Sequence, residues 1–178
     1  MCDSKVMVSI IMGAYNVSSL SMLDKAIESI LLQSLSDFEF IICDDGSTDD
    51  TWNRLNKFMQ KDSRIRLLRN KKNQGLAAAL NHCLRFAQGE FIARQDADDI
   101  SDPYRLEKQV RFLKQHENIG FVGTNCDLFD ENGIWRNRCF PEFPTKKDFL
   151  FTLPFVHGSL LFRREILLNN PYKVSKET

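Results

Sequence analysis

The sequence predicts an α/β fold with a mostly parallel central sheet flanked by helices. Four short apolar runs have the length and the Val, Ile, Leu and Phe content of strands buried on both faces of such a sheet. Each run precedes a segment whose apolar residues recur every three or four positions, which is typical of an amphipathic helix. Alternation of strand and helix indicates parallel strands joined by right-handed crossovers.

The first two strand-helix units are predicted to comprise a strand at residues 6–12, a helix at 20–31, a strand at 38–43 and a helix that begins at Ser47 or Thr48. The first strand should end in the loop Gly13-Ala14-Tyr15-Asn16. Acids in the first turn of the second helix suit the positive end of its dipole. The residues of that helix expected to face inward are Trp52, Leu55, Phe58 and Met59.

The elements predicted next are a strand at 65–68, a helix at 76–86, a strand at 91–93, a helix at 102–116 and a strand at 119–123. Asp102 followed by Pro103 is a common helix start, with the acid as cap and the proline at the first helical position. After residue 125, two strand-like runs flank an Asn-Gly pair, which predicts a small hairpin. The last expectations are a short helix at 146–153, a strand at 155–162, a helical turn at 164–168 and no regular structure at 169–178.

Length and composition suit one domain with a sizeable core, because the chain has 178 residues and is 43% hydrophobic. Twenty-four basic and 24 acidic residues cancel, so no nucleic-acid partner is expected. Five cysteines without a CxxC spacing argue against a disulfide framework or a zinc site, and Cys43 and Cys83 are expected in the core. Neither a signal peptide nor a transmembrane segment is predicted, which favours a cytoplasmic location and leaves peripheral attachment at the inner face of a membrane open.

Four polar loops are expected at the carboxyl edge of the sheet, where open parallel sheets bind their ligands. They span residues 13–17, 44–48, 70–75 and 95–99. The ring of Tyr15 could cover a base, and Asp44 or Asp45 could accept a hydrogen bond from a base N–H or a ribose hydroxyl. These loops therefore predict a nucleotide site.

The segment from Gly89 to Pro103 places four acids directly after a predicted strand: Asp96, Asp98, Asp99 and Asp102. Carboxylates this close repel one another unless a cation or fixed donors lie among them. Asp99 and Asp102 can be turn and cap residues, whereas Asp96 and Asp98 are predicted to bind a divalent metal. Such a metal would hold the diphosphate of the nucleotide.

Other phosphate and metal sites are excluded by their spacing. The chain has neither GxGxxG after the first strand nor GxxxxGK[ST]. The acids at 44 and 45 are adjacent, unlike those of the DxDGT phosphatases. An EF-hand starting at Asp96 would need glycine at its sixth position, where Ser101 stands. His157 is a weaker metal candidate, because a lone histidine in a strand-like run is more often structural.

Five motifs together resemble the family 2 glycosyltransferases of the GT-A fold, in their order and spacing. They are VSIIMGAYN, IICDDGSTDDT, NQGLAAALN, RQDADD and VHGSLLFRR. The resemblance covers nearly the whole chain and implies a single Rossmann-like GT-A domain over residues 1–178. Residues 1–124 would be its nucleotide-binding half, and residues 125–178 would begin the acceptor-side half. The implied reaction moves a sugar from a nucleotide donor, most often a UDP-sugar, to a glycan or lipid-linked acceptor with inversion.

The resemblance also implies roles for the residues that match these motifs. Ala14 and Tyr15 would line the base and ribose, Asp45 would bond the base with Asp44 as the second candidate, and the loop before Gly75 would lie along the nucleotide.

In the same motifs, Asp96 would approach the ribose or the metal. Asp98, the last acid of the DxD motif, would be the main protein ligand to Mn²⁺ or Mg²⁺.

One departure from the family pattern concerns the general base, which can contribute about 10²–10⁴ in rate. In the family this base is an acid in an ED-type motif, and it is expected beyond Thr178. The chain is therefore expected to be a donor-binding portion truncated at its C-terminus. Two alternatives stay open: a nucleotide-sugar-binding module without catalysis, and a nucleotidyltransferase. The latter usually carries a basic Gly-rich loop after its first strand, where this chain has GAYNVSS.

Overall fold

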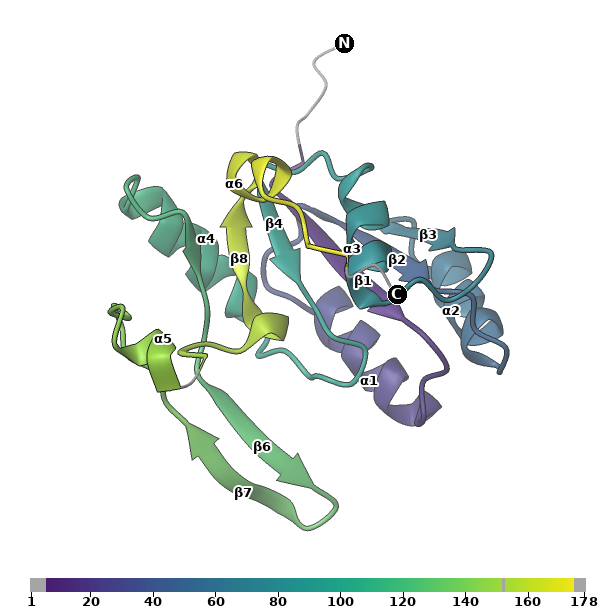
Figure 1. Ribbon diagram of the computed structural model, residues 1–178. Coiled ribbons are helices and arrows are strands. Elements are labelled where there is room, and N and C mark those ends of the chain that lie inside the picture. The colour runs from purple at the N-terminus through teal and green to yellow at the C-terminus, as the bar shows by residue number, and fades with distance from the viewer. Residues whose placement is uncertain (1–5, 152, 175–178) are drawn as a thin grey trace.

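The computed structural model describes residues 6–151 and 153–174. A six-stranded sheet in the order β3-β2-β1-β4-β8-β5 forms its centre, and β6 and β7 form a separate hairpin (Figure 1). Strands β1 to β4 are mutually parallel, whereas β8 runs antiparallel to its neighbours β4 and β5. The predicted α/β fold with a mostly parallel sheet is therefore confirmed.

The strands are β1 (Val8–Ala14), β2 (Phe38–Asp44), β3 (Ile65–Arg69), β4 (Phe91–Arg94), β5 (Phe121–Val122), β6 (Cys126–Asp130), β7 (Gly133–Arg138) and β8 (Leu161–Arg163). The helices are α1 (Leu20–Leu31), α2 (Thr51–Lys61), α3 (Leu76–Leu84), α4 (Arg105–Gln115), α5 (Asp148–Phe151) and α6 (Arg164–Asn169), with a 3₁₀ turn η1 (His157–Ser159). None of these helices is long and apolar enough to cross a bilayer.

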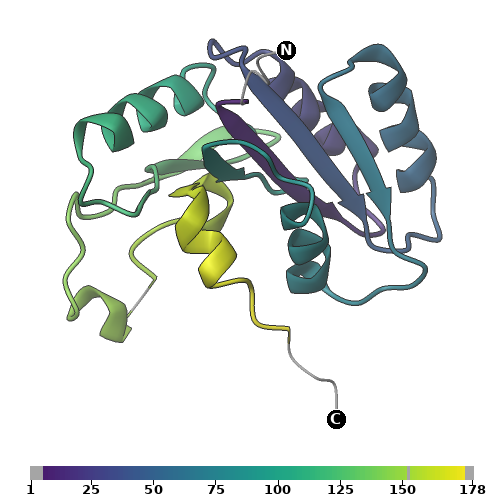
Figure 2. The ribbon, with the colours of Figure 1, turned by 90° about the horizontal axis from the view of Figure 1, so that it is seen from above.

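Helices α1, α2 and α4 cover one face of the sheet, and α3 and α6 cover the other (Figure 2). Side chains alternate between the two faces along a strand, so each central strand must be apolar on both sides. In β1, Ile10 and Met12 pack toward α1 while Ile11 packs toward α3. Cys43 and Cys83 are fully buried in the α3 layer, as predicted for core residues.

The first strand begins and ends two residues later than predicted. Gly13 and Ala14, expected in a loop, pair with Cys43 and Asp44 of β2 and extend the parallel ladder. Gly13 also lies under α3, where an added Cβ would come within 2.9 Å of Leu76. The close contact with α3 therefore explains why position 13 is a glycine, and no turn is needed to explain it.

The start predicted for the second helix was wrong, because α2 begins at Thr51 with Asp50 as its N-cap residue. Ser47 and Thr48 instead bond to the loop after β1. The Asn16 N–H donates to Ser47 Oγ, and the Thr48 N–H donates to Asn16 Oδ1. These tertiary bonds use the groups that would otherwise have capped the helix.

The inward face predicted for α2 is correct only in part. Leu55 and Phe58 are buried and Trp52 is half-buried, whereas Met59 is exposed.

The start predicted for α4 was also wrong, because the helix begins at Arg105 rather than Asp102. Asp102 still has a local role, since its carboxylate accepts the N–H of Tyr104, the N-cap residue. Gln33, at the end of α1, donates its side-chain amide to the Asp102 carbonyl and accepts the Leu106 N–H. This bridge from α1 holds the segment before α4 in a turn.

The predicted strand at 155–162 is instead the 3₁₀ turn η1 followed by the short strand β8. Ser159 closes the turn, because both its N–H and its hydroxyl donate to the Val156 carbonyl. The strand expected at 119–123 shrinks to the two residues of β5. The hairpin is confirmed, with Gly133 at φ 116°, a value that glycine adopts readily.

The helix predicted at 146–153 forms only at α5, and α6 ends one residue beyond the turn predicted at 164–168. Residues 169–174 contain no helix or strand beyond the last residue of α6, as expected. Residue 152 and residues 175–178 lie outside the described residues.

Candidate functional site

The loops after β1, β2 and β3 are hydrogen-bonded to one another at the carboxyl edge of the sheet. The Asp45 N–H donates to the Ala14 carbonyl at 2.8 Å, and the Asn70 N–H donates to the Asp44 carbonyl at 2.9 Å. Asn16, at φ 41°, adds the bonds to Ser47 and Thr48. The structure thus brings three of the four predicted loops into one connected unit.

Asp45 is the buried centre of this unit. Its Oδ2 accepts the N–H groups of Gln74 and Gly75 at 3.0 and 2.8 Å, and its Oδ1 accepts the Asn70 side-chain amide at 2.6 Å. Gly75 has φ 87° and follows directly on this contact, at the N-terminus of α3. Asp45 and Gly75, predicted separately from their motifs, are therefore bonded to each other.

Asp44 is fully buried and faces a different set of groups. Its Oδ2 lies 3.0 Å from Arg69 Nε and accepts the Ser47 N–H, while its Oδ1 has no partner among the described residues. Arg69 in turn lies over the ring of Trp52, with 4.5 Å between the guanidinium carbon and the ring centroid. An unpaired buried carboxylate oxygen is costly, so Asp44 Oδ1 is an open acceptor in this loop.

Tyr15 is 44% exposed directly after buried Ala14. Its ring therefore lies free at the end of β1, next to the loop unit held by Asn16. Of the residues predicted to line a base, Tyr15 is the one with an apolar surface open to a ligand.

The acid cluster lies after β4 and meets the turn η1. A Cβ added to Gly158 would lie 2.6 Å from Asp99 Oδ2 and 2.9 Å from Asp96 Oδ2, so both carboxylates press against this glycine. Asp98 is exposed beside them. The turn that contains Gly158 therefore packs against the acid cluster. The two segments are about 60 residues apart in the sequence, so the sequence did not indicate this contact.

Two buried arginines lie next to the acid cluster. Arg94 binds Asp96 Oδ1 through Nε and Nη2, at 3.1 and 2.8 Å. Arg105 donates to the carbonyl groups of Arg94 and Gly158. Burial lowers the pKa of Arg105 to about 10, although Asp99 and Asp96 act to raise it. Arg105 therefore stays charged at neutral pH beneath the acids.

The remaining acids repel one another. Asp99 is exposed as a residue, but partial burial of its carboxyl group raises its pKa. The negative charges of Asp96 and Asp98 raise this pKa further. Such mutual repulsion favours a cation among the carboxylates.

His157 lies next to this cluster. Its pKa is lowered by partial burial and by the charge of Arg94, with Asp96 acting in the opposite direction. A lowered pKa keeps the imidazole neutral at pH 7, which a metal ligand requires.

These residues suit a divalent metal that binds together with a diphosphate and takes part of its coordination from the phosphate oxygens. Within residues 6–151 and 153–174, no three Asp, Glu, His or Cys side chains converge as a ready-made metal site. Mg²⁺ is commonly bound by only one or two carboxylates together with substrate phosphates and water. The carboxylate oxygens of Asp96 and Asp98 are donors of the type that Mg²⁺ prefers.

Several residues of the site were not predicted. Arg94 lies two positions before Asp96 in RQDADD, so its charge was a readable signal. Arg105 lies on a helix, and Asn70 and His82 form a side-chain pair in which His82 Nδ1 lies 2.8 Å from Asn70 Oδ1. No local pattern marks these contacts, because each joins separate elements.

Comparison with known proteins gives a consistent assignment. Residues 9–169 match the family described as glycosyl transferase family 2. The chain is 47% identical over 157 residues to EpsE of Bacillus subtilis (strain 168), which is named as a glycosyltransferase, covering 88% of this chain and 56% of that protein. It is 38% identical over 128 residues to WfgD of Escherichia coli, named UDP-Glc:alpha-D-GlcNAc-diphosphoundecaprenol beta-1,3-glucosyltransferase, covering 72% and 49% of the two chains.

Solved structures share the fold. The mannosyltransferase PcManGT of Pyrobaculum calidifontis, in complex with GDP-Man and Mn²⁺, superposes with a TM-score of 0.72 at 20% identity, covering 94% of this chain and 48% of that one. Residues 1–349 of S. aureus TarS, in complex with UDP-GlcNAc, give a TM-score of 0.65 at 22% identity, covering 92% and 47%. The chain thus spans about half the length of the proteins it matches.

Proposed function

The chain belongs to glycosyl transferase family 2, and from this premise we propose that the carboxyl edge of its sheet binds a UDP-sugar together with Mn²⁺ or Mg²⁺. The sugar is transferred with inversion to a lipid-linked glycan acceptor. The observation that carries the proposal is the position of the acid cluster, which lies at the same sheet edge as the connected loops of Asp45.

The nucleoside is assigned to the connected loops. Tyr15 offers its exposed ring to the base, and Ala14 lies beside it at the end of β1. Asp45 accepts from the base, with Asp44 as the second acceptor of the loop. Gly75 is the N-cap residue of α3, and the N-terminal end of this helix faces the loop, which favours an anionic ligand.

The metal is assigned to Asp98, with Asp96 as its companion. Asp98 is exposed and takes part in no ion pair among the described residues, so it can reach a metal bound to a diphosphate without breaking one. When bound, a divalent ion neutralises the charge that develops on the nucleoside diphosphate leaving group. The buried guanidinium of Arg94 holds Asp96 in place through its ion pair, and Arg105 adds a buried positive charge beside the cluster.

The general base is assigned outside residues 1–178. Asp98 and Asp96 already have roles at the donor side, Asp98 toward the metal and Asp96 in the ion pair with Arg94. Proton removal from an acceptor hydroxyl needs a further group within hydrogen-bond reach of that hydroxyl.

The relatives and structural neighbours described above support the proposed classes of donor and acceptor. One structural neighbour was solved with GDP-Man and Mn²⁺, and another with UDP-GlcNAc. WfgD is named for a UDP-Glc donor and a lipid-diphosphate acceptor. A uridine donor and a lipid-linked acceptor are the choices that these names favour for this chain.

Calorimetric titration of UDP into the chain, with and without Mn²⁺, tests the donor assignment. We expect Mn²⁺-dependent binding that Asp98→Ala abolishes and that the control Asp130→Ala, at an exposed acid of the hairpin, leaves intact. GDP titrated in parallel checks the base. Equal binding of UDP with and without metal, or an unaffected Asp98→Ala, would contradict the assignment.

A nucleotide-sugar-binding module without catalysis is the alternative to a transferase. Turnover of a UDP-sugar by a longer form of the protein, compared with residues 1–178, separates the two. Binding without turnover in both forms would favour the module.

A further inference from the structure

Two cavities adjoin each other beside the hairpin and α5. The smaller, of about 270 Å³, is bounded by β7 and by residues near α5, and the larger has a volume of about 590 Å³. Phe140, Pro141 and Pro154 line both cavities. The two spaces are therefore neighbours that share one wall.

The larger cavity is strongly apolar. Its lining includes the phenylalanines Phe112, Phe121, Phe140, Phe143, Phe149 and Phe155. Phe143 is 61% exposed and Phe149 is 50% exposed, so the aromatic surface is open to solvent. Exposed apolar surface of this kind marks a binding site for a partner or a ligand, here one with a hydrocarbon part.

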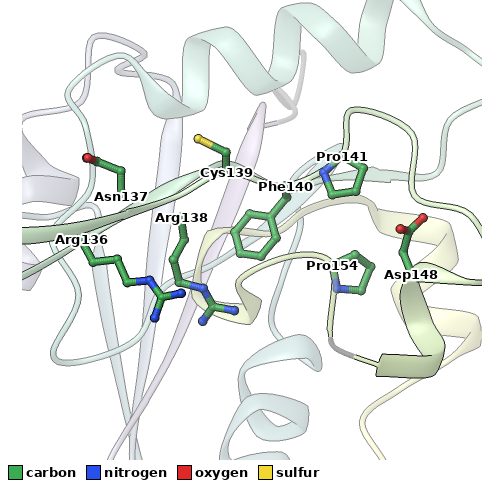
Figure 3. A pocket seen from close by; sticks show the side chains of 8 residues that line it. All are labelled: Arg136, Asn137, Arg138, Cys139, Phe140, Pro141, Asp148 and Pro154. Carbon is green, nitrogen blue, oxygen red and sulfur yellow. The ribbon is translucent and has the colours of Figure 1, made fainter.

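The smaller cavity is basic. Arg136 and Arg138 lie two positions apart on β7 and therefore point to the same side of the strand, whereas Asn137 points to the other side (Figure 3). The Arg138 guanidinium lies over the shared-wall residue Phe140, with 5.4 Å between the guanidinium carbon and the ring centroid. Within the described part of the chain, neither arginine takes part in an ion pair.

The surroundings leave these two positive charges uncompensated. Their cross-strand neighbours on β6 are Cys126 and Leu128, neither of which is acidic. Asp127 pairs with Asn137 on the opposite side of the hairpin. The one carboxylate in the lining of the smaller cavity belongs to Asp148, whose Oδ2 accepts the N–H and the hydroxyl of Thr145, and Glu142 lines the larger cavity. Guanidinium groups in such a setting suit an anion with several oxygens, above all a diphosphate.

Both cavities lie next to the acid cluster. Phe155 of the larger cavity stacks on His157, with ring centroids 5.6 Å apart, and the following residue, Gly158, contacts Asp96 and Asp99. On the arginine side, Cys126 pairs across the hairpin with Arg138, and the pKa of its thiol is raised first by burial and then by Asp99, while Arg138 lowers it. Acids, arginines and aromatic cavity are thus three neighbouring regions of one surface.

We propose that this surface binds the lipid-linked acceptor, with Arg136 and Arg138 on its diphosphate and the phenylalanine cavity on the first units of its isoprenoid chain. The inference rests on the proposed function, because it places the acceptor saccharide toward the acid cluster and the donor. A saccharide joined through a diphosphate to an isoprenoid has one part for each of these three regions. The charge and the apolar lining of the two cavities match its last two parts.

Farnesyl diphosphate, used below its micelle-forming concentration, is the probe for this site. Calorimetry on the full chain compares it with inorganic pyrophosphate, with farnesol and with phosphatidylglycerol vesicles. The variants are Arg136→Glu with Arg138→Glu, and Phe143→Ser with Phe149→Ser. The matched control is Arg66→Glu with Arg85→Glu, two exposed arginines outside both cavities. Circular dichroism checks that each variant is folded.

Farnesyl diphosphate should bind more tightly than either pyrophosphate or farnesol. The arginine variant should weaken farnesyl diphosphate by about tenfold or more and weaken pyrophosphate as well. The phenylalanine variant should weaken only farnesyl diphosphate, and the control should change neither.

Farnesyl diphosphate that binds no better than pyrophosphate, or equally well to the arginine variant, would overturn the inference. Arginine-dependent binding to phosphatidylglycerol vesicles without binding of farnesyl diphosphate would also overturn it, because it would indicate a general anionic membrane surface. UDP binding with Mn²⁺ is measured on the same variants. If it persists while farnesyl diphosphate fails, the acceptor site is refuted and the donor assignment stands.

Discussion

The side-chain amide of Asn70 donates to Asp45 Oδ1 at 2.6 Å, and this bond ties the end of β3 to the end of β2. The carbonyl oxygen of the same amide lies 2.8 Å from Nδ1 of His82 on α3. Because that oxygen can only accept, the His82 Nδ1 must carry a proton. Asn70 therefore orients the buried carboxylate of Asp45 and is itself oriented by a helix.

Replacing Asn70 with alanine should destabilise the fold and weaken UDP binding. The substitution leaves a buried oxygen of Asp45 without its donor, which costs about 1–3 kcal/mol. Urea denaturation measures the loss, and titration of UDP measures the binding. Asn53→Ala, at an exposed asparagine that bonds only Asp50, should change both much less. Equal stability of the two variants would show that the Asn70 bond contributes little.

His82 should make stability dependent on pH below about 6.5, its ordinary pKa. Burial and the charge of Arg85 lower the pKa of His82 in the folded state. The unfolded chain therefore takes up the proton first as pH falls, so stability is full above the unfolded pKa and decreases below it. Urea denaturation at pH 7.5 and at pH 5.5 checks this.

His82→Gln should flatten that dependence relative to the parent. His157, whose pKa is also lowered, adds a dependence of the same sign, so His157→Gln is measured beside it. An unchanged pH dependence in His82→Gln would exclude His82 as a source.

Replacing Gly158 with alanine should disturb the acid cluster. The new Cβ would lie 2.6 Å from Asp99 Oδ2 and 2.9 Å from Asp96 Oδ2, so one or both carboxylates must move. We expect Mn²⁺-dependent UDP affinity to fall about tenfold, equivalent to about 1.4 kcal/mol. Gly123→Ala is the control, because its Cβ would meet Leu160 and Phe155 at 3.3 and 3.4 Å. Unchanged metal-dependent affinity in Gly158→Ala would argue against Asp96 as a companion ligand.

Replacing Arg105 with leucine should destabilise the protein by about 1–3 kcal/mol, the cost of leaving a buried acceptor without its donor. In the variant, the carbonyl groups of Arg94 and Gly158 lose a hydrogen-bond donor. The nearby carboxylates of Asp96 and Asp99 also lose a positive charge. Thermal and urea unfolding measure the effect. Arg105→Lys keeps the charge without the forked guanidinium and should fall between leucine and the parent. A lysine variant as unstable as the leucine variant would assign the whole effect to hydrogen-bond geometry.

The local pattern of the sequence determined the elements that depend on near neighbours. Apolar runs such as that of β1 located the buried strands, and Asn132-Gly133 located the hairpin turn. The strand-then-helix order also indicated that the polar loops would share one sheet edge. Element ends were less well determined, because Ser47, Thr48 and Asp102 form tertiary or turn contacts in place of the helix caps expected of them.

Only the tertiary structure decided which groups meet inside the site. Gly158 reaches Asp96 and Asp99 through β8, a strand that joins the sheet antiparallel beside β4, and nothing near residue 158 in the sequence specifies that pairing. Arg105 contacts the carbonyl groups of Arg94 and Gly158, and His82 contacts Asn70, each from a helix whose spacing identified only an apolar face. Strands and helices arise from periodicities of a few residues, whereas contacts between loops depend on how distant elements pack. The sequence alone therefore determined where a site should lie, and the fold decided which charges, glycines and amides complete it.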